Sequence, residues 1–247
     1  MARNTVLSSL IDQRTHTRCA LVPIKALVNA KQRLNPVLTK NQRQQLSKAM
    51  AHDVLSALSL LPNLALCICA GDDYGIDLAK EFNAALIHDS ELPYAGLDTI
   101  AATYSHRMAT QGFSHAMIIH ADIPLLNAST LEMIFESQAS HDVVLVADRH
   151  GEGTNIVSWR LGSGFVTNFG TNSRARHLTQ CADLNLRVRE IHCGNTALDI
   201  DTPNDLQLLY RSTHLAAGTQ TRNFLDQVST SMNMPIGSEA LLATANA

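Results

Sequence analysis

The feature that most constrains the fold is the alternation of short apolar runs with longer amphipathic segments over the first 150 residues. Leu64–Ala70 is continuously apolar, as expected for a strand buried on both faces. Similar runs occur at 19–23, 84–88, 116–120 and 143–147. Strands that alternate with helices at short spacing indicate a parallel sheet covered on both sides. We therefore predict an α/β fold with a single-domain, mostly parallel, doubly wound sheet.

Helices are expected between these strands, at 39–60, 74–82, 97–111 and 127–139. The first has the clearest start, because Thr39 and Gln42 make a capping box. After Asp148 the alternation loosens, with further strands expected at 156–160 and 186–191 and further helices beginning near Ser173 and Thr202.

The domain is expected to span residues 18–215. Residues 1–17 read as a flexible leader, because they are polar and mixed. From Ala216 to the end at 247 the chain is rich in Ala, Thr and Ser with little periodicity, which predicts a loosely ordered tail. No internal repeat or linker divides the chain.

Composition excludes several classes of protein. The 247 residues are 45% hydrophobic and 17% charged, with a net charge of −3 and no basic stripe, so no nucleic-acid partner is expected. No apolar run approaches the ~18 residues of a membrane span, and the first residues lack an apolar signal core. We therefore expect no membrane partner and a cytoplasmic location. The five cysteines include no C-x-x-C, which predicts reduced, packed thiols, with Cys67 and Cys69 on one face of a strand.

Three cations follow the first predicted strand. Lys25, Lys31 and Arg33 come shortly after Pro23, where the carboxyl end of that strand opens. In open parallel sheets this crevice is where ligands bind, and cations on a loop there suit a polyanion such as a nucleoside triphosphate. On spacing alone, a solvated charged loop is an equally good interpretation.

Three aspartates are candidates for a divalent cation. Asp122 directly follows a buried strand at the same edge as Lys25, although a turn or capping role would also place an aspartate there. Asp199 and Asp201 are two residues apart, so on an extended chain they share one face. With a triphosphate, the three carboxylates could hold Mg²⁺. Asp205 we assign to capping the helix that begins at Thr202.

Two glycine-containing segments could bind an anion. The loop 151–155 is weak evidence on its own. Gly170 with Ser173 is better, because a small residue and a hydroxyl stand at a predicted helix N-terminus. Arg174 and Arg176 could add charge there, with one of them expected to point to solvent. Packed or capping roles are expected for four of the histidines: His52, His88, His120 and His177. The sequence contains no Ser in a Gly-x-Ser-x-Gly motif and no Cys beside an activating His, so covalent catalysis is not expected.

Together these motifs resemble the CofC/FbiD guanylyltransferases of coenzyme F(420) biosynthesis. The matching blocks, in the family's order from about residue 20 to 210, are Val22–Lys25, Ala30–Leu34, Asp53–Leu55, Gly96–Asp98, Ala121–Leu126, Gly151–Asn155, Phe169–Gly170, Ser173, Arg176–His177 and Leu198–Leu206. The ordered series is more specific than any single block.

The resemblance implies a fold like that of sugar-phosphate and molybdopterin nucleotidyltransferases. It also implies transfer of GMP from GTP to a phosphorylated three-carbon acid, with release of pyrophosphate. Family members use 2-phospho-L-lactate, phosphoenolpyruvate or 3-phospho-D-glycerate.

The resemblance also carries over roles to residues of this chain. Thr154, Gly170 and Ser173 would hold the acid, and Asp122, Asp199 and Asp201 the Mg²⁺. Lys25, Lys31 and Arg33 would meet the triphosphate, with Asp122, Lys25 and Lys31 acting in catalysis. Asp98 is a departure, because the family often has Asn there, and a carboxylate cannot donate a hydrogen bond as an amide can.

Alternatives remain at this point. A related nucleotidyltransferase for a sugar phosphate or molybdopterin, or a non-catalytic nucleotide-binding protein, would share the fold. The presence of all three aspartates argues against a protein that has kept the fold but lost catalytic activity. The sequence leaves open which acid is used, whether the chain forms a homodimer, whether the product is handed to the next enzyme, and what the tail does.

Overall fold

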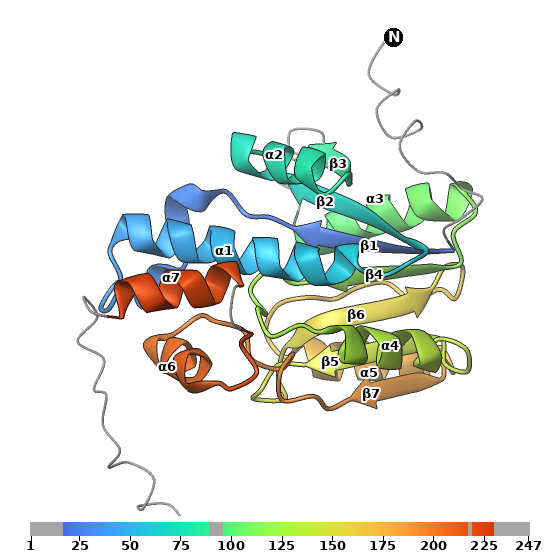
Figure 1. Cartoon of the computed structure of the whole chain (residues 1–247). Helices are drawn as coiled ribbons and strands as arrows, with labels where there is room; N and C mark the ends of the chain where they lie inside the picture. The colour runs from blue at the N-terminus through green and yellow to red at the C-terminus, as the bar shows by residue number, and fades with distance from the viewer. Residues whose placement is uncertain (1–16, 89–95, 217–218, 230–247) are drawn as a thin grey trace, which may run out of the picture.

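The structure is a computed structural model that describes residues 17–88, 96–216 and 219–229 (Figure 1). Its strands are β1 Arg18–Pro23, β2 Leu64–Ala70, β3 Ala85–His88, β4 His115–Ile119, β5 Val143–Ala147, β6 Thr154–Arg160 and β7 Val188–Ile191. Its α-helices are α1 Lys40–Ser59, α2 Asp73–Glu81, α3 Leu97–Thr110, α4 Ala128–Ser137, α5 Ser173–Asp183, α6 Pro203–Arg211 and α7 Gln220–Val228. Two short 3-10 turns, η1 Leu27–Asn29 and η2 Gln32–Leu34, lie between β1 and α1.

The strands form one sheet in the order β3-β2-β1-β4-β6-β5-β7. Every neighbouring pair is parallel except the two that β6 makes, with β4 and with β5. The connection from β5 to β6 is a short loop, and a parallel pair needs a crossover of a dozen or more residues, so β6 must run backwards. The predicted α/β fold with a mostly parallel sheet is confirmed.

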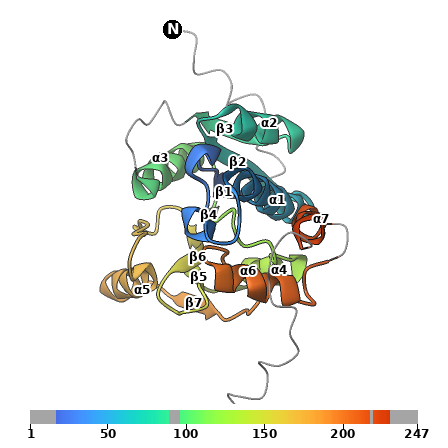
Figure 2. The same cartoon turned by 90° about the vertical axis from the view of Figure 1, so that its left-hand side faces the viewer.

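Helices cover both faces of the sheet, because the buried strands alternate in the direction of their side chains. In β2, Leu66 and Ile68 join the apolar cluster that α1, α2 and α4 cover. Cys67 and Cys69 point to the opposite face, toward α3 and α5, as predicted. Figure 2 shows α3 and α5 on one side of the sheet and α1 and α4 on the other.

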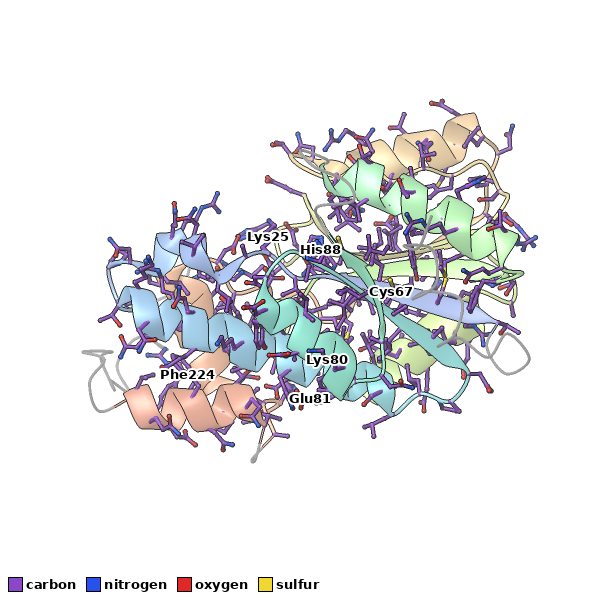
Figure 3. The ribbon with its side chains drawn as sticks, turned by 90° about the horizontal axis from the view of Figure 1, so that it is seen from above. Lys25, Cys67, Lys80, Glu81, His88 and Phe224 are labelled. Carbon is purple, nitrogen blue, oxygen red and sulfur yellow. The ribbon has the colours of Figure 1, made fainter. Side chains whose placement is uncertain are left out.

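Within the segment expected to be a loosely ordered tail, residues 220–228 form helix α7. The rest of that tail beyond Ser229 and residues 1–16 of the expected leader lie outside the described residues. Helix α7 lies along α1 and α6, and Phe224 and Leu225 are buried in an apolar cluster that these three helices share (Figures 1 and 3). Asp53 in α1 fixes its start, because the Asp53 carboxylate accepts hydrogen bonds from the backbone N–H groups of Gln220 (2.9 Å) and Thr221 (2.8 Å). The helix has weak sequence signals, and α1 and α6 supply the apolar surface that stabilises it.

Within the described part of the chain, no helix combines the length and the apolar character that crossing a bilayer requires.

Candidate functional site

One cleft at the carboxyl ends of the central strands brings the predicted site residues together. Its volume is about 1570 Å³. The ten residues proposed above for nucleotide, acid or metal all line it: Lys25, Lys31, Arg33, Asp98, Asp122, Thr154, Gly170, Ser173, Asp199 and Asp201. The amino end of β6 reaches the same edge because β6 is antiparallel, which explains how Thr154 joins residues that follow β1 and β4. Lys25 and His88 lie at this end of the sheet, away from Lys80 and Glu81 (Figure 3).

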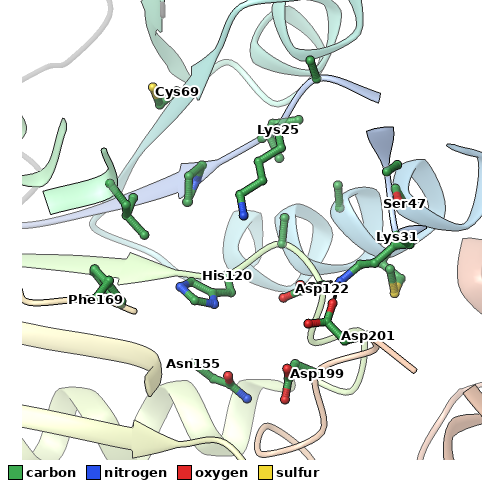
Figure 4. A pocket seen from close by; sticks show the side chains of 18 of the residues that line it. Lys25, Lys31, Ser47, Cys69, His120, Asp122, Asn155, Phe169, Asp199 and Asp201 are labelled. Atoms are coloured by element: carbon green, nitrogen blue, oxygen red, sulfur yellow. Dashed lines mark hydrogen bonds and ion pairs between the residues drawn. The ribbon is translucent and has the colours of Figure 1, made fainter. Parts of the chain in front are cut away.

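The Lys31 ammonium lies between two aspartates. Its Nζ is 2.6 Å from Asp122 Oδ2 and 2.8 Å from Asp201 Oδ1 (Figure 4). The Lys31 backbone is left-handed, with φ of 47°, where η2 begins, so the loop turns sharply at this residue. Burial alone would lower the pKa of Lys31, but the two carboxylates outweigh it and raise the pKa above its usual value.

The other two cations are more open to solvent. Arg33 is 76% exposed in its side chain and approaches Asp201 only at 3.8 Å. Lys25 is exposed, and within the described residues its ammonium forms no ion pair. Figure 4 shows its amino end pointing into the cleft toward His120. Lys25 is therefore the cation with the most freedom to meet an anionic ligand.

The acidic residues come from two segments that are hydrogen-bonded to each other. The backbone N–H of Ile200 donates to the carbonyl of Asp122 (3.1 Å), and the Ile200 side chain is buried in the core. Asp199 and Asp201, on either side of Ile200, both line the cleft near Asp122 (Figure 4), as the spacing predicts. Burial would raise the pKa of Asp122, but the Lys31 ammonium and its hydrogen bond hold it below the usual value. Burial and the neighbouring charges of Asp122 and Asp201 raise the pKa of Asp199.

The donor set is compatible with Mg²⁺ if the substrate completes the coordination. Among the described residues, Asp122 Oδ1 is buried without a hydrogen-bond partner. Burial raises the pKa of Asp199, and the charges of Asp122 and Asp201 raise it further; a nearby cation would relieve that repulsion. Among the described residues, no group of three or more His, Cys, Asp or Glu side chains is arranged to hold a metal ion. Mg²⁺ usually takes one or two protein carboxylates together with phosphate oxygens and water, so a full protein cage is not required.

Asp205 caps α6 as predicted and also fixes the acidic segment. Its Oδ2 accepts hydrogen bonds from the backbone N–H groups of Thr202 (2.7 Å) and Asp201 (3.2 Å). Arg149 pairs with the other oxygen at 2.6 Å. These bonds keep the backbone of Asp201 in place beside Lys31.

Two hydroxyls face the cleft on its other side. Ser173 Oγ lies 3.3 Å from Thr154 Oγ1, and His177 Nδ1 lies 3.1 Å from the same Thr154 oxygen. Ser173 is the first residue of α5, so the predicted hydroxyl at a helix N-terminus is present. His177 is fully buried, which lowers its pKa to about 4 and keeps the ring neutral near pH 7.

The loop around Gly170 is held from both sides. The backbone N–H of Phe169 donates to Asp98 Oδ1 (2.9 Å), and Arg176 Nη2 donates to the Phe169 carbonyl (2.6 Å). Gly170 has φ of 105°, and a Cβ there would lie 3.2 Å from Arg176 Nη2. One oxygen of Asp98 is thus engaged within the protein, and contact between Asp98 and a nucleotide stays a prediction.

The structure corrects two expectations about anion binding. The backbone N–H groups of His150, Glu152 and Gly153 donate to the carboxylate of Asp148, so the loop 151–155 already surrounds an anion of the protein itself. Gly153 is needed for this, because a Cβ there would lie 2.7 Å from Asp148 Oδ2.

The two arginines of α5 also differ from expectation. Arg174 pairs with Glu190, and Arg176 bonds to the backbone carbonyl of Phe169; neither lines the cleft.

Two further residues line the cleft that sequence reasoning did not assign to the site, Asn155 and His120. Asn155 is buried and donates to the carbonyls of Thr196 (3.0 Å) and Ala197 (3.2 Å), which anchors the segment leading to Asp199. The His120 ring stacks near Phe169, with centroids 5.4 Å apart. The sequence marks these two residues as site candidates only by position, because His120 ends a buried strand and Asn155 directly follows Thr154.

Comparison with known proteins identifies the family. A family model described as "Guanylyl transferase CofC like" matches residues 18–244. The chain belongs to this family. The match extends past α6, so the family region includes helix α7.

Relatives from several organisms are similar over most of their length. The chain is 29% identical over 221 residues to a phosphoenolpyruvate guanylyltransferase of Conexibacter woesei, covering 85% of this chain and 95% of the relative. It is 31% identical to the enzyme of that name from Chloroflexus aurantiacus, covering 77% and 93%. It is also 27% identical to a 2-phospho-L-lactate guanylyltransferase of Methanosphaera stadtmanae, covering 90% and 94%.

Solved structures show the same fold at low identity. A protein described as a nucleotide-diphospho-sugar transferase from Desulfovibrio desulfuricans has a TM-score of 0.70 at 18% identity, covering 87% of this chain and 96% of that one. A nucleotidyl transferase from Methanothermobacter has a TM-score of 0.56 at 11% identity, covering 85% and 99%. These structures show the fold, and the family and its curated relatives support a guanylyl-group transferase.

Proposed function

We propose that this protein transfers GMP from GTP to a phosphorylated three-carbon acid and releases pyrophosphate. The observation that carries the proposal is the composition of the cleft. It is lined by the exposed cation Lys25, by the Asp122 carboxylate and by the hydroxyl pair Thr154 and Ser173. The relatives named as guanylyltransferases support the same reaction. The proposal includes a role in coenzyme F(420) assembly, which the family resemblance implies, and a cytoplasmic location, which the composition suggests.

The reaction needs little covalent help from the protein. A phosphate monoester has its second pKa at about 6, so the attacking phosphate is already largely ionised near neutral pH. The barrier lies in bringing this anion against the α-phosphate of GTP. Lys25, exposed and pointing into the cleft, is suited to hold the triphosphate and to balance charge on the departing pyrophosphate.

The acidic residues would hold Mg²⁺. Asp122 offers its unpartnered Oδ1, and Asp199 and Asp201 lie beside it. When bound, Mg²⁺ supplies charge stabilisation and orients the phosphates. Lys31 balances the charge of Asp122 and Asp201 and keeps the two segments together, and Arg33 at the rim adds positive charge near the triphosphate.

The acid would bind at the opposite wall. Thr154 and Ser173 supply hydroxyls, and Gly170 leaves room beside them because it has no side chain. The candidate acids all carry a carboxylate and a phosphate, and a hydroxyl bonds readily to either. Phosphoenolpyruvate, 2-phospho-L-lactate and 3-phospho-D-glycerate remain the candidate acceptors.

The proposal is tested by measuring pyrophosphate release with GTP and Mg²⁺, offering each of the three acids separately. Release with one acid alone is the expected result and identifies the acceptor. The control replaces GTP with ATP, which should give little release. No pyrophosphate release with any of the three acids, in a protein that still binds GTP, would contradict the proposed acceptor class.

A further inference from the structure

The hydrogen bonds of His177 determine which of its ring nitrogens carries the proton. Nε2 lies 2.8 Å from the backbone nitrogen of Asn168, and a backbone N–H can only donate, so Nε2 must accept. A neutral imidazole has one donor and one acceptor nitrogen, so its proton is on Nδ1. Nδ1 in turn lies 3.1 Å from Thr154 Oγ1, which therefore accepts a hydrogen bond from His177.

The two hydroxyls have one hydrogen more than their contacts within the protein use. Thr154 and Ser173 bring two hydroxyl hydrogens, and the 3.3 Å contact between their oxygens uses one of them. Because His177 donates to Thr154 and takes no hydrogen from it, the second hydroxyl hydrogen remains. Both residues line the cleft, so this hydrogen can point toward a ligand. With the opposite tautomer, Thr154 would donate to Nδ1, and the pair would face the cleft with no spare hydrogen unless their mutual bond broke.

The surroundings keep His177 in this state. The ring has no exposed surface and lies between Phe165 and Phe169, with centroid distances of 5.6 and 5.5 Å. Burial disfavours the imidazolium form, in which Nε2 would carry a proton facing the N–H of Asn168. The loop that supplies this N–H is itself held by Asp98 and Arg176.

We propose that His177 is a positioning residue that makes the Thr154–Ser173 pair a hydrogen-bond donor toward an anionic oxygen of the acid substrate. The inference rests on the proposed function for the identity of the ligand. The tautomer and the hydrogen count stand on the structure alone. His177 acts through the hydroxyls and does not itself line the cleft.

The direct test is to measure the histidine tautomer by two-bond proton–nitrogen NMR on the intact protein at pH 7. The His177 signal, assigned by its loss in His177→Phe, should show the proton on Nδ1. A proton on Nε2, or on both nitrogens, would overturn the proposal whatever the enzyme's activity.

Kinetics test the effect on substrate binding. His177→Phe keeps a buried ring but removes the Nδ1–H that holds the Thr154 oxygen as an acceptor. Both hydroxyl hydrogens remain, but their direction is no longer fixed, so the KM for the acid should rise by about 3- to 10-fold, the effect of one ordinary hydrogen bond. The KM for GTP should stay unchanged. His177→Asn can place its amide nitrogen near Nδ1 and should keep the acid KM closer to that of the wild type. This second variant keeps the test open if His177→Phe does not fold.

The matched control is Phe165→Leu, because the Phe165 ring packs against the His177 ring and has no nitrogen or oxygen that could donate to either hydroxyl. It should lower thermal stability without changing the acid KM. An unchanged acid KM in folded His177→Phe, or an equal rise in Phe165→Leu, would overturn the proposal. Absence of turnover in the wild type with every acid would instead contradict the proposed function, and the NMR result would still decide the polarity of the hydroxyls.

Discussion

Lys31 and Asp122, 91 residues apart in the chain, lie with Nζ and Oδ2 only 2.6 Å apart at the centre of the cleft. The contact joins the loop after β1 to the loop after β4. Because Asp201 also meets the same ammonium, one cation balances two carboxylates from separate segments. The remaining Asp122 oxygen has no hydrogen-bond partner among the described residues, and in the proposed function it binds Mg²⁺.

Replacing Asp122 by Asn should therefore affect turnover more than folding. The change removes the negative charge but keeps the size of the side chain, and Lys31 still pairs with Asp201. We expect turnover to fall by about 100-fold or more, as for loss of transition-state charge stabilisation, with only modest weakening of GTP binding. The measurements are steady-state pyrophosphate release and calorimetric titration with GTP.

The control for this change is Asp77→Asn, on the exposed side of α2, where the aspartate pairs with Lys80 at the surface. It should leave both quantities unchanged. Unchanged turnover in Asp122→Asn would remove Asp122 from the proposed metal site.

Gly170 should tolerate a methyl group poorly. Alanine there must adopt φ near 105° and place its Cβ 3.2 Å from Arg176 Nη2. We expect the free energy of unfolding to fall by about 1–3 kcal/mol and the acid KM to rise, because the loop beside Ser173 must shift. Gly194→Ala is the matched control, since its φ is ordinary and nothing lies within 4 Å of the added atom. Urea unfolding of both variants compares them, and equal losses would show that Gly170 is not constrained.

Asp53 should stabilise the C-terminal helix. Asp53→Ala removes the acceptor for the N–H groups of Gln220 and Thr221, so we expect a loss of about 1–2 kcal/mol in the free energy of unfolding. Glu132→Ala, at an exposed position of α4, provides the same substitution without such bonds and should change stability by less than about 0.5 kcal/mol. Hydrogen exchange should locate the loss in α7, and uniform loss elsewhere with α7 intact would contradict the assignment.

Stability should fall on acidification between pH 6.5 and pH 4. Burial lowers the pKa of His177 from 6.5 to about 4, with Arg176 lowering and Asp98 raising it. In this range the unfolded chain binds a proton that the folded chain does not, so acid favours unfolding. The contribution is about 3 kcal/mol and is fully present above pH 6.5.

Comparing the wild type with His177→Phe isolates this effect. Burial also lowers the pKa of His115 and of His120, but both histidines are present in either protein and cancel in the difference. Urea unfolding at several pH values should show a steeper decline for the wild type. Equal slopes would mean that His177 titrates normally.

Local signals explain how much of the fold the sequence could predict. The capping box at Thr39 and the apolar run Leu64–Ala70 each determine an element from neighbouring residues, and both elements are present. The spacing of Asp199 and Asp201 predicted a shared side because alternation along an extended chain is also a local property. Helix α7 was missed because its stability comes from α1 and α6 rather than from its own residues.

The sequence by itself determined the order of strands and helices and the chain positions of cations and carboxylates at strand ends. Only the tertiary structure decided which of them meet: Lys31 with Asp122 and Asp201, Asp148 with the N–H groups of its own loop, and His177 with Thr154. The physical reason is that hydrogen bonds and charge pairing act over a few ångströms in space. Residues separated by tens of positions come within that range only when the sheet and its helices have packed.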